Sequence, residues 1–466
     1  MLIHRYVGIA IGLLMLVWLL SGVVMLFARW PEVDEARRVE ALPPIPWTGC
    51  CTFPDLRPET GLDSAAVEGL AGTPVLRLPS GTFDLTTGKP IESIGPEQAK
   101  RVAADFAARS ALAGAPRSAE PLERDQWTVT GYFNQHRPLW KVSFDDPAHS
   151  VVYVSAANGK VVQATDRQAR ILSWLGVIPH WLYPAILRQD AKLWAQVVIW
   201  TSAIGTFLTL TGLYLGVVTL GRTHSGRLSP YRGLMAWHHW AGLGTGLLTL
   251  AWVFSGLMSM NPWGLLESPD SETPARVTGD VAYGDLTAAL DQAKGLAAGQ
   301  VRLAPLDGRL FLIVGGERLD AAGRPAPLTE ADLAVAASRA GPLREQQMIH
   351  KDDAYYYGHH DPVRLPAWRA TLANGDRLYL DGRTGEVAAF VDAPARGFRW
   401  LHLGLHRFDF IRGFDRGAGW ATAMVLLLAA ATFGVGTGVW LAFRRARHDL
   451  GQLARRARDR DGPPGN

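Results

Sequence analysis

Four long segments without a charged residue constrain the fold of this 466-residue chain more than any other feature. Each is longer than the roughly 20 residues that a helix needs to cross a lipid bilayer, where only a helix satisfies its own backbone polar groups. The composition also indicates a membrane protein with sizeable soluble parts, because hydrophobic residues make up 48% and charged residues 19%. The segments are residues 6–28, 193–220, 240–260 and 417–443.

The first segment also resembles a cleavable signal peptide, since Arg5 precedes it. However, its apolar stretch is long for such a peptide, and no small-x-small cleavage pattern stands between Phe27 and Pro31. We therefore expect this segment to remain in the protein as a transmembrane helix.

Arginines in the short loops predict the orientation, because basic residues favour the cytoplasmic side. The loop at residues 221–233 contains Arg222, Arg227 and Arg232 and no acidic residue, and the tail from residue 444 onward is rich in arginine. The tail also suits contact with anionic membrane lipid. We expect a bacterial inner-membrane location, cytoplasmic termini and two long periplasmic regions. The net charge of +4 does not indicate a nucleic-acid-binding protein.

An internal repeat relates the two halves of the chain. Residues 4–22 match residues 238–256 in constant register, so that Trp18 corresponds to Trp252. Each half has the order span, soluble region, span, and the two halves therefore enter the membrane in the same sense, related by an axis along the membrane normal. A second constant offset aligns Trp174, His180, Trp194 and Thr211-Gly212 with Trp400, His406, Trp420 and Thr437-Gly438.

The soluble regions have an α+β pattern. In the first, Pro96 opens an amphipathic helix to about residue 111, and strands follow at residues 140–144, 151–154 and 160–163. In the second, Thr329 begins the corresponding helix. The predicted fold is an α-helical membrane protein, with a four-helix bundle from two parallel two-span repeats and two α+β extracytoplasmic domains. Its divisions are residues 1–29 (helix 1), 30–170 (first extracytoplasmic domain), 171–220 (interfacial segment and helix 2), 221–236 (cytoplasmic loop), 237–260 (helix 3), 261–396 (second extracytoplasmic domain), 397–443 (interfacial segment and helix 4) and 444–466 (basic cytoplasmic tail).

Histidines recur at the ends of the spans in both halves: His4 and His238 begin the first and third spans, and His180 and His406 precede the second and fourth. Water or a backbone carbonyl usually satisfies a lone histidine at a membrane boundary, but recurrence in both repeats favours a shared role. Two opposed imidazoles suit the axial positions of a haem iron, whereas zinc requires three or four ligands in a compact arrangement. We therefore expect two haem groups, one between His4 and His238 and one between His180 and His406, separated in depth by roughly 30 Å.

Two further histidines are secondary ligand candidates. His239 adjoins His238 and points about 100° away on a helix, so only one of them can face a given centre. His402 lies one turn before His406, but Gly176 occupies the matching position in the first half. Pro179 and Pro184 predict a broken helix around His180.

A polar and aromatic segment at residues 350–361 is a possible external substrate loop. It could bind a metal ion or an oxygen-rich chelate, or it could be a polar loop packed by its aromatic side chains. Its candidate residues are His350, Tyr355, His359, His360 and Asp361.

The two cysteines, Cys50 and Cys51, are adjacent, so neither a disulfide framework nor a cysteine-rich metal site is possible. They form either a vicinal disulfide or two ordinary thiols.

Several motifs along the chain form a recognisable set: His4-Arg5-Tyr6-x-Gly8, His239-Trp240-x-Gly242, Tyr355-Tyr356-Tyr357, Leu365-Pro366, Tyr379-x-Asp381-x-x-Thr384-Gly385 and Arg399-Trp400-Leu401-x-x-Gly404-Leu405-His406-x-Phe408-Asp409-Phe410. With them the sequence resembles the PepSY-associated transmembrane family, which includes inner-membrane proteins of iron uptake and ferric-siderophore reduction. The resemblance covers essentially the whole chain and implies two PepSY-like external domains, haem b held by intramembrane histidines, and electron delivery to an external ferric chelate. The long arm at residues 30–73 and the segment around His180 depart from the family pattern.

The expected function is therefore that of a haem-dependent transmembrane ferric reductase. No glycine-rich nucleotide fingerprint is present, so the electron donor would be a quinol, a reduced flavin or a separate reductase. One alternative is a non-redox PepSY membrane protein that binds a peptide or a protease. Another is a transporter component, although the spans lack the charged residues that usually mark a transport pathway.

Overall fold

The computed structural model describes residues 2–110, 112–221, 228–358, 363–410 and 417–460, with all of their side chains except those of residues 454 and 456–460. The chain forms two compact units. The helical unit consists of Met1–Trp30, Ala169–Leu266 and Gly397–Asn466, and the sheet unit consists of Pro31–Gln168 and Glu267–Arg396. Each unit therefore combines residues from both halves of the sequence.

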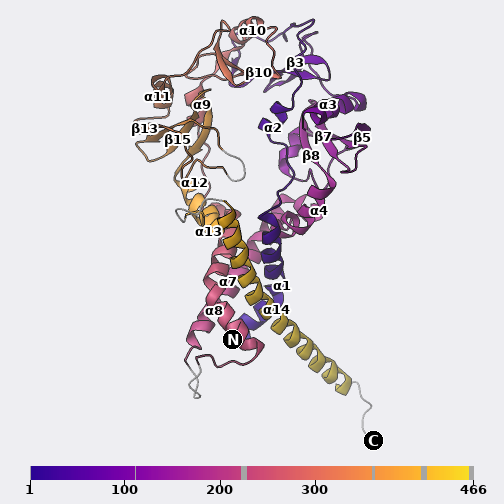
Figure 1. Ribbon diagram of the computed structural model, residues 1–466, viewed down its shortest axis with the longest axis vertical. Coiled ribbons are helices and arrows are strands. Elements are labelled where there is room, and N and C mark those ends of the chain that lie inside the picture. Colours follow the sequence, from indigo (N-terminus) through magenta and orange to yellow (C-terminus); the bar gives the residue numbers. More distant parts are fainter. Residues whose placement is uncertain (1, 111, 222–227, 359–362, 411–416, 461–466) are drawn as a thin grey trace. The chain divides into compact units, whose positions relative to one another are not determined.

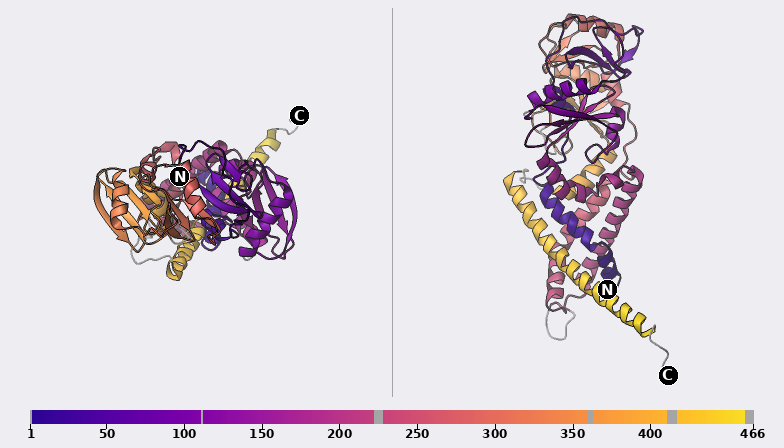
Figure 2. Two further views of the ribbon diagram at one scale, coloured as in Figure 1. Left: turned by 90° about the horizontal axis from the view of Figure 1, so that it is seen from above. Right: turned by 90° about the vertical axis from the view of Figure 1, so that its right-hand side faces the viewer.

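Among its described residues, the helical unit contains four helices that are long and apolar enough to cross a membrane, at the four predicted places. They pack against one another as a bundle (Figure 1), and the last of them extends past the other three at its C-terminal end (Figure 2). These lengths and compositions indicate a membrane protein. The helices are α1 (Leu2–Met25), α7 (Ala191–Val218), α8 (Leu234–Ser259) and α14 (Ala418–Arg460).

Glycines allow these helices to approach closely. A Cβ atom added to Gly246 on α8 would lie 2.5 Å from Cδ2 of Leu213 on α7, and one added to Gly205 would lie 3.0 Å from Cγ1 of Val253. Small residues at helix crossings replace the hydrophobic driving force that is absent in lipid with close van der Waals contact.

Short helices precede α7 and α14, where the sequence predicted interfacial segments. The breaks near Pro179 and Pro184 are present, and Leu182 and Phe408 end their helices in the left-handed conformation, with φ of 51° and 53°. The short elements are α4 (Arg167–Leu175), α5 (Val177–Trp181) and α6 (Ala185–Arg188) before α7, η2 (Pro262–Gly264) after α8, and α12 (Ala393–Phe398), the π-helical turn η3 (Arg399–Gly404) and α13 (Leu405–Arg407) before α14.

The sheet unit contains two four-stranded antiparallel sheets, one from each half, and each packs against one helix. The predicted helices and strands are confirmed in place, with Pro96 at the first position of α3 and Thr329 as the N-cap of α11. The first sheet has α3 (Pro96–Arg109), β5 (Pro116–Leu122), β6 (Leu139–Phe144), β7 (Val151–Ser155) and β8 (Val161–Thr165); the second has α11 (Glu330–Ser338), β13 (Leu343–Ile349), β14 (Ala367–Leu372), β15 (Arg377–Asp381) and β16 (Val387–Val391).

A six-stranded sheet joins the two halves, which the sequence analysis had assigned to separate domains. Strand β10 of the second half pairs with β2 of the first, with Val301 opposite Val67, in the order β12-β11-β10-β2-β3-β4. The core beneath it contains residues of both halves, so neither half can bury its three short strands alone. The strands are β2 (Ala66–Leu70), β3 (Thr73–Leu78), β4 (Gly81–Asp84), β10 (Gln300–Leu303), β11 (Phe311–Val314) and β12 (Glu317–Asp320), with β1 (Gly61–Leu62), β9 (Val281–Ala282), α2 (Glu35–Glu40), α9 (Thr273–Thr278), α10 (Tyr283–Gln292) and η1 (Gly131–His136) completing the unit.

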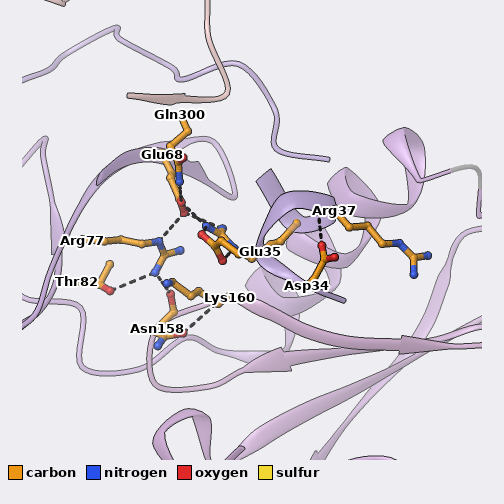
Figure 3. Close-up of polar contacts among 10 residues, drawn as sticks. Asp34, Glu35, Arg37, Glu68, Arg77, Thr82, Asn158, Lys160 and Gln300 are labelled. Carbon is orange, nitrogen blue, oxygen red and sulfur yellow. Dashed lines mark hydrogen bonds and ion pairs between the residues drawn. The ribbon is translucent and has the colours of Figure 1, made fainter. Parts of the chain in front are cut away.

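A buried carboxylate connects the strands at this junction (Figure 3). Glu68 on β2 is fully buried and accepts hydrogen bonds from Arg38 Nη2 (2.5 Å), Arg77 Nε (2.6 Å) and Gln300 Nε2 (2.7 Å). Burial alone would raise the pKa of Glu68, but the charges of Arg77 and Arg38 outweigh it and hold the pKa well below its usual range. Glu68 is therefore ionised and links the two halves of the sheet.

Candidate metal centres

The inner pair of histidines meets inside the helical unit. His4 on α1 and His238 on α8 have ring centroids 6.3 Å apart, with planes inclined by 36°. His4 Nδ1 lies 3.1 Å from the carbonyl oxygen of Leu208 on α7, and His238 Nδ1 lies 3.1 Å from that of Gly434 on α14. A threonine hydroxyl is the second neighbour of each Nδ1: Thr211 Oγ1 at 3.4 Å from His4 and Thr437 Oγ1 at 3.2 Å from His238.

The outer pair is arranged in a similar way. His180 on α5 and His406 on α13 have ring centroids 6.1 Å apart, with planes inclined by 78°. His180 Nδ1 lies 3.0 Å from the carbonyl oxygen of Trp18 and 3.2 Å from Ser21 Oγ. His406 Nδ1 lies 2.9 Å from Ser255 Oγ, a hydroxyl that itself donates to the Trp252 carbonyl. Both serines are buried.

These contacts determine which ring nitrogen carries the proton. A carbonyl oxygen only accepts, so the Nδ1 atoms of His4, His180 and His238 must donate. The Ser255 hydroxyl uses its proton on a carbonyl, so His406 Nδ1 must donate as well. Neutral imidazole then has its lone pair on Nε2, and the Nε2 atoms of all four rings make no hydrogen bond within the part of the chain that the structure describes. A donor Nδ1 and an open Nε2 are typical of histidine ligands to a metal.

The ring separations match a metal ion held between two imidazoles. Nitrogen ligands of imidazole bind transition metals at about 2.0–2.1 Å, and the ring radius is roughly 1.1 Å for bonds of about 1.33 Å. Two rings on opposite sides of one ion would thus have centroids roughly 6.3 Å apart by the same bond lengths. The observed separations are 6.3 Å and 6.1 Å.

The metal would need other ligands of its own. Among the described residues, no group of three or more His, Cys, Asp or Glu side chains could hold a metal ion. A bare zinc ion would therefore be under-coordinated at either pair, whereas an iron ion in a porphyrin brings four equatorial nitrogens and requires only two axial imidazoles. The donor set fits a haem.

Two glycines make room for the inner rings. A Cβ atom at Gly212 would lie 2.7 Å from His4 Cε1, and one at Gly438 would lie 2.8 Å from His238 Cε1. Both distances are shorter than any real Cβ contact, so these positions require glycine if the imidazoles keep their places. In contrast, a Cβ at Gly22 would lie 3.5 Å from His180 Cε1, which is an ordinary contact.

The two pairs are closer in depth than the sequence predicted. His180 contacts Trp18, which follows His4 by 14 residues on α1, and this corresponds to about 21 Å along the helix rather than roughly 30 Å. The difference arises because the segment containing His180 reaches back to a point inside α1 instead of ending at the outer limit of the helix.

His239 is placed differently from the paired histidines. It is buried, its Nδ1 lies 2.8 Å from Ser229 Oγ, and its Nε2 lies 2.9 Å from the carbonyl oxygen of Gly216. Both ring nitrogens thus have protein partners, and neither is open to a metal. The adjacent His238, which the repeat register favours, faces His4 instead.

His402 lies beside the outer pair, with its ring centroid 5.6 Å from that of His406. Its Nδ1 lies 3.0 Å from the Ser255 carbonyl oxygen. A side chain at the matching Gly176 would be crowded, because a Cβ there would lie 3.0 Å from Val24 Cγ1. The outer site is therefore asymmetric between the two halves.

The supporting hydroxyls were not identified as site residues from the sequence. Ser21 and Ser255, like Thr211 and Thr437, stood out only as markers of the repeat. Their recurrence at equivalent positions of the two halves was the only sequence feature that could have identified them. Their hydrogen bonds to the histidines join different helices, so sequence spacing does not predict them.

The external candidate loop is only partly described. His359, His360 and Asp361 lie outside the described residues, as do Arg222 and Arg227 of the predicted cytoplasmic loop. His350 is exposed, and Tyr355 stacks against Arg377 with its ring centroid 4.4 Å from Cζ.

The start of this loop is held by Asp353, which accepts from the backbone N–H groups of Tyr355 and Tyr356 and from Tyr379 Oη. Burial alone would raise the pKa of Asp353, but these hydrogen bonds and the one from Arg369 lower it below its ordinary value.

Cys50 and Cys51 form a disulfide with each other and pack against the core of the six-stranded sheet.

Comparison with known proteins adds no assignment. The chain matches no model of a known protein family, and no curated protein sequence matches it significantly. The geometry of the histidine pairs is therefore the strongest indication of function in this protein.

Proposed function

We propose that this protein is a haem b protein of the bacterial inner membrane that passes electrons to an external ferric chelate, such as a ferric siderophore. The observation that supports this most directly is the pair of ring separations, 6.3 Å and 6.1 Å, each between imidazoles whose Nδ1 atoms are occupied and whose Nε2 atoms are open. Two such pairs at different depths of one helix bundle suit a two-step path across a membrane.

In this proposal His4 and His238 hold the inner haem, and His180 and His406 hold the outer haem. The haem groups supply one-electron chemistry when they are bound. Two axial imidazoles leave no open coordination position on the iron, which favours electron transfer over oxygen binding. Leu208 O and Thr211 Oγ1 occupy the Nδ1 side of His4, as the equivalent groups do at His238, and so leave the Nε2 lone pair to bind the iron.

The equivalent contacts in the two halves support the proposed duplication. His4 contacts positions 208 and 211 of α7, and His238 contacts positions 434 and 437 of α14, at the constant offset of the sequence repeat. The indoles of Trp194 and Trp420 likewise donate to the matching carbonyls of Trp181 and Arg407. We propose that the PepSY-like motifs reflect the same ancestry, with the sheet unit in the periplasm and both termini in the cytoplasm.

The electron donor in this proposal is a quinol, a reduced flavin or a separate reductase. The chain has no glycine-rich nucleotide-binding fingerprint. Electrons would enter near His4 and His238 and leave near His180 and His406 for the ferric chelate.

An absorption spectrum tests the haem assignment. Protein purified in detergent from haem-replete cells should be red, contain two haems per chain, and show a Soret band that sharpens and shifts when dithionite is added. A colourless preparation would contradict the proposal and favour the non-redox binding protein or the transporter component.

Proteoliposomes test the direction and the substrate. With a reductant enclosed and a ferric chelate outside, ferrous iron should appear outside at a rate that depends on haem content. Haem-loaded vesicles that form no ferrous product would leave the haem assignment standing and exclude the proposed acceptor.

A further inference from the structure

Two imidazoles of the second half, those of His402 and His406, lie next to each other at the outer pair. His402 and His406 lie four residues apart, their ring centroids are 5.6 Å apart, and both Nδ1 atoms are held by Ser255. Ser255 uses its hydroxyl for His406 and its carbonyl oxygen for His402. The two rings therefore present the same tautomer.

The ring of His402 has the same hydrogen-bonding state as the four paired histidines. Its Nδ1 donates to a carbonyl oxygen, which leaves the lone pair on Nε2. Within the described residues, this Nε2 makes no hydrogen bond. The same combination characterises His180 and His406, whereas His239 has both nitrogens occupied.

The backbone around His402 is suited to a change of register. Residues Arg399–Gly404 form a π-helical turn, η3, which is rare and occurs often at functional sites. Arg399 at the start of η3 and Asp409 after α13 form a buried ion pair, with Nη1 to Oδ1 at 2.9 Å. This pair connects the two ends of the segment that contains both histidines.

The size of the required movement matches one helical turn. Residues four apart on a helix are separated by about 5.4–6 Å along the axis, and one-turn shifts of packed elements are a known type of transition. The separation of 5.6 Å between the two rings agrees with such a shift. No ring contact joins His402 to His180 in the described structure, so His406 is the partner of His180 in this conformation.

We propose that His402 is an alternative axial ligand of the outer haem iron, exchanging with His406 on the second-half side while His180 remains bound. This inference rests on the proposed haem function. In the exchange, the iron bond to His406 Nε2 breaks and a bond to His402 Nε2 forms, with no electron or proton transferred, because both rings carry their proton on Nδ1. The first half has no equivalent choice, because Gly176 occupies the position that matches His402.

Haem content of full-length variants in detergent tests the exchange. H406A should keep at least half of its outer haem in a low-spin state, because His402 replaces the missing ligand. H180A should lose the outer haem, and the double variant H402A/H406A should lose it as well. The double variant should regain its low-spin signal with added imidazole and should retain the inner haem throughout, which shows that the bundle is folded.

Electron paramagnetic resonance tests the exchange in the unmodified protein. The low-spin signal of the ferric outer haem should have two components in the wild type and one in H402A. Loss of the outer haem from H406A to the same extent as from H180A would overturn the proposal, as would a single component in both proteins or loss of the outer haem from H402A alone. None of these results would affect the two-haem assignment, which fails if the wild type binds fewer than two haems per chain.

Discussion

The helical unit and the sheet unit both contain residues of the two halves of the chain, but they differ in the hydrogen bonding of their buried polar groups. In the sheet unit, the carboxylate of Glu68 is saturated by two arginines and a glutamine from three different strands or helices. In the helical unit, four imidazoles converge in pairs and each leaves Nε2 without a hydrogen bond in the described structure. A saturated cluster stabilises a fold, whereas polar atoms left open at a fixed separation indicate a ligand.

The largest expected effect is the loss of haem when a histidine with an unbonded Nε2 is replaced. Under the proposed function, H238A should remove the inner haem, about half of the total, because only His4 would remain to bind the iron. H239A is the matched control and should keep both haems, since both nitrogens of His239 already have protein partners. Haem quantification per chain measures the effect. Equal haem content in the two variants would remove the distinction between open and saturated histidines.

The saturated cluster should respond through stability rather than cofactor content. E68Q leaves the buried Arg77 without the carboxylate that it pairs with, while Arg38 keeps its ion pair with Glu35, and should destabilise the six-stranded sheet by about 3–5 kcal/mol. Hydrogen exchange of β2, β3 and β10 in the full-length protein measures this loss.

The matched control for Glu68 is E97Q, which removes an exposed ion pair with Lys100 and should change stability by less than about 0.5 kcal/mol. Similar exchange rates in E68Q and E97Q would show that the buried cluster does not join the two halves. Haem content should remain unchanged in both variants.

A smaller and more local change should follow from filling the space beside an imidazole. G438A places a Cβ 2.8 Å from His238 Cε1, so the ring must shift and the inner haem should be held at least severalfold more weakly. G256A is the control, because its Cβ would have no neighbour within 4 Å. The rate of haem loss measures the difference. If both variants lose haem at the wild-type rate, then the inner ring is not held in the position described.

A change in pH should affect an exception within the sheet unit. His136 is buried, and its Nδ1 has no hydrogen-bond partner among the described residues. Burial, assisted by the charge of Lys160, lowers its pKa from 6.5 to about 4. The unfolded chain therefore binds a proton between these pH values that the folded chain does not, and stability should fall as the pH drops from about 6.5 to 4, by no more than about 1.4 kcal/mol per pH unit.

Replacing this histidine tests the source of that pH dependence. H136Q should reduce the slope of the unfolding free energy in this pH range, whereas H350Q, at an exposed position, should not. Urea unfolding of the full-length protein at several pH values measures both slopes. A wild-type slope in H136Q would assign the dependence to other groups.

The sequence by itself determined the four apolar helices, their approximate ends and the strands of the two four-stranded sheets. These features depend on local patterns, namely uncharged runs longer than a bilayer and alternating strands bounded by turns. The pairing of His4 with His238 and of His180 with His406 also followed from the repeat register, because equivalent residues in a duplicated bundle lie on opposite sides of its axis.

Only the tertiary structure decided the rest. The pairing of β10 with β2 joins residues more than 200 positions apart, and no local pattern specifies such a contact because the short strands become stable only together. The hydrogen bonding of each imidazole nitrogen also depends on residues that are far apart in the sequence. His238 and His239 are adjacent in the sequence, and the helix rotation directs one toward His4 and the other toward Ser229 and Gly216. Whether a nitrogen is open or occupied depends on carbonyl and hydroxyl groups of neighbouring helices, which the sequence does not bring together until the chain folds.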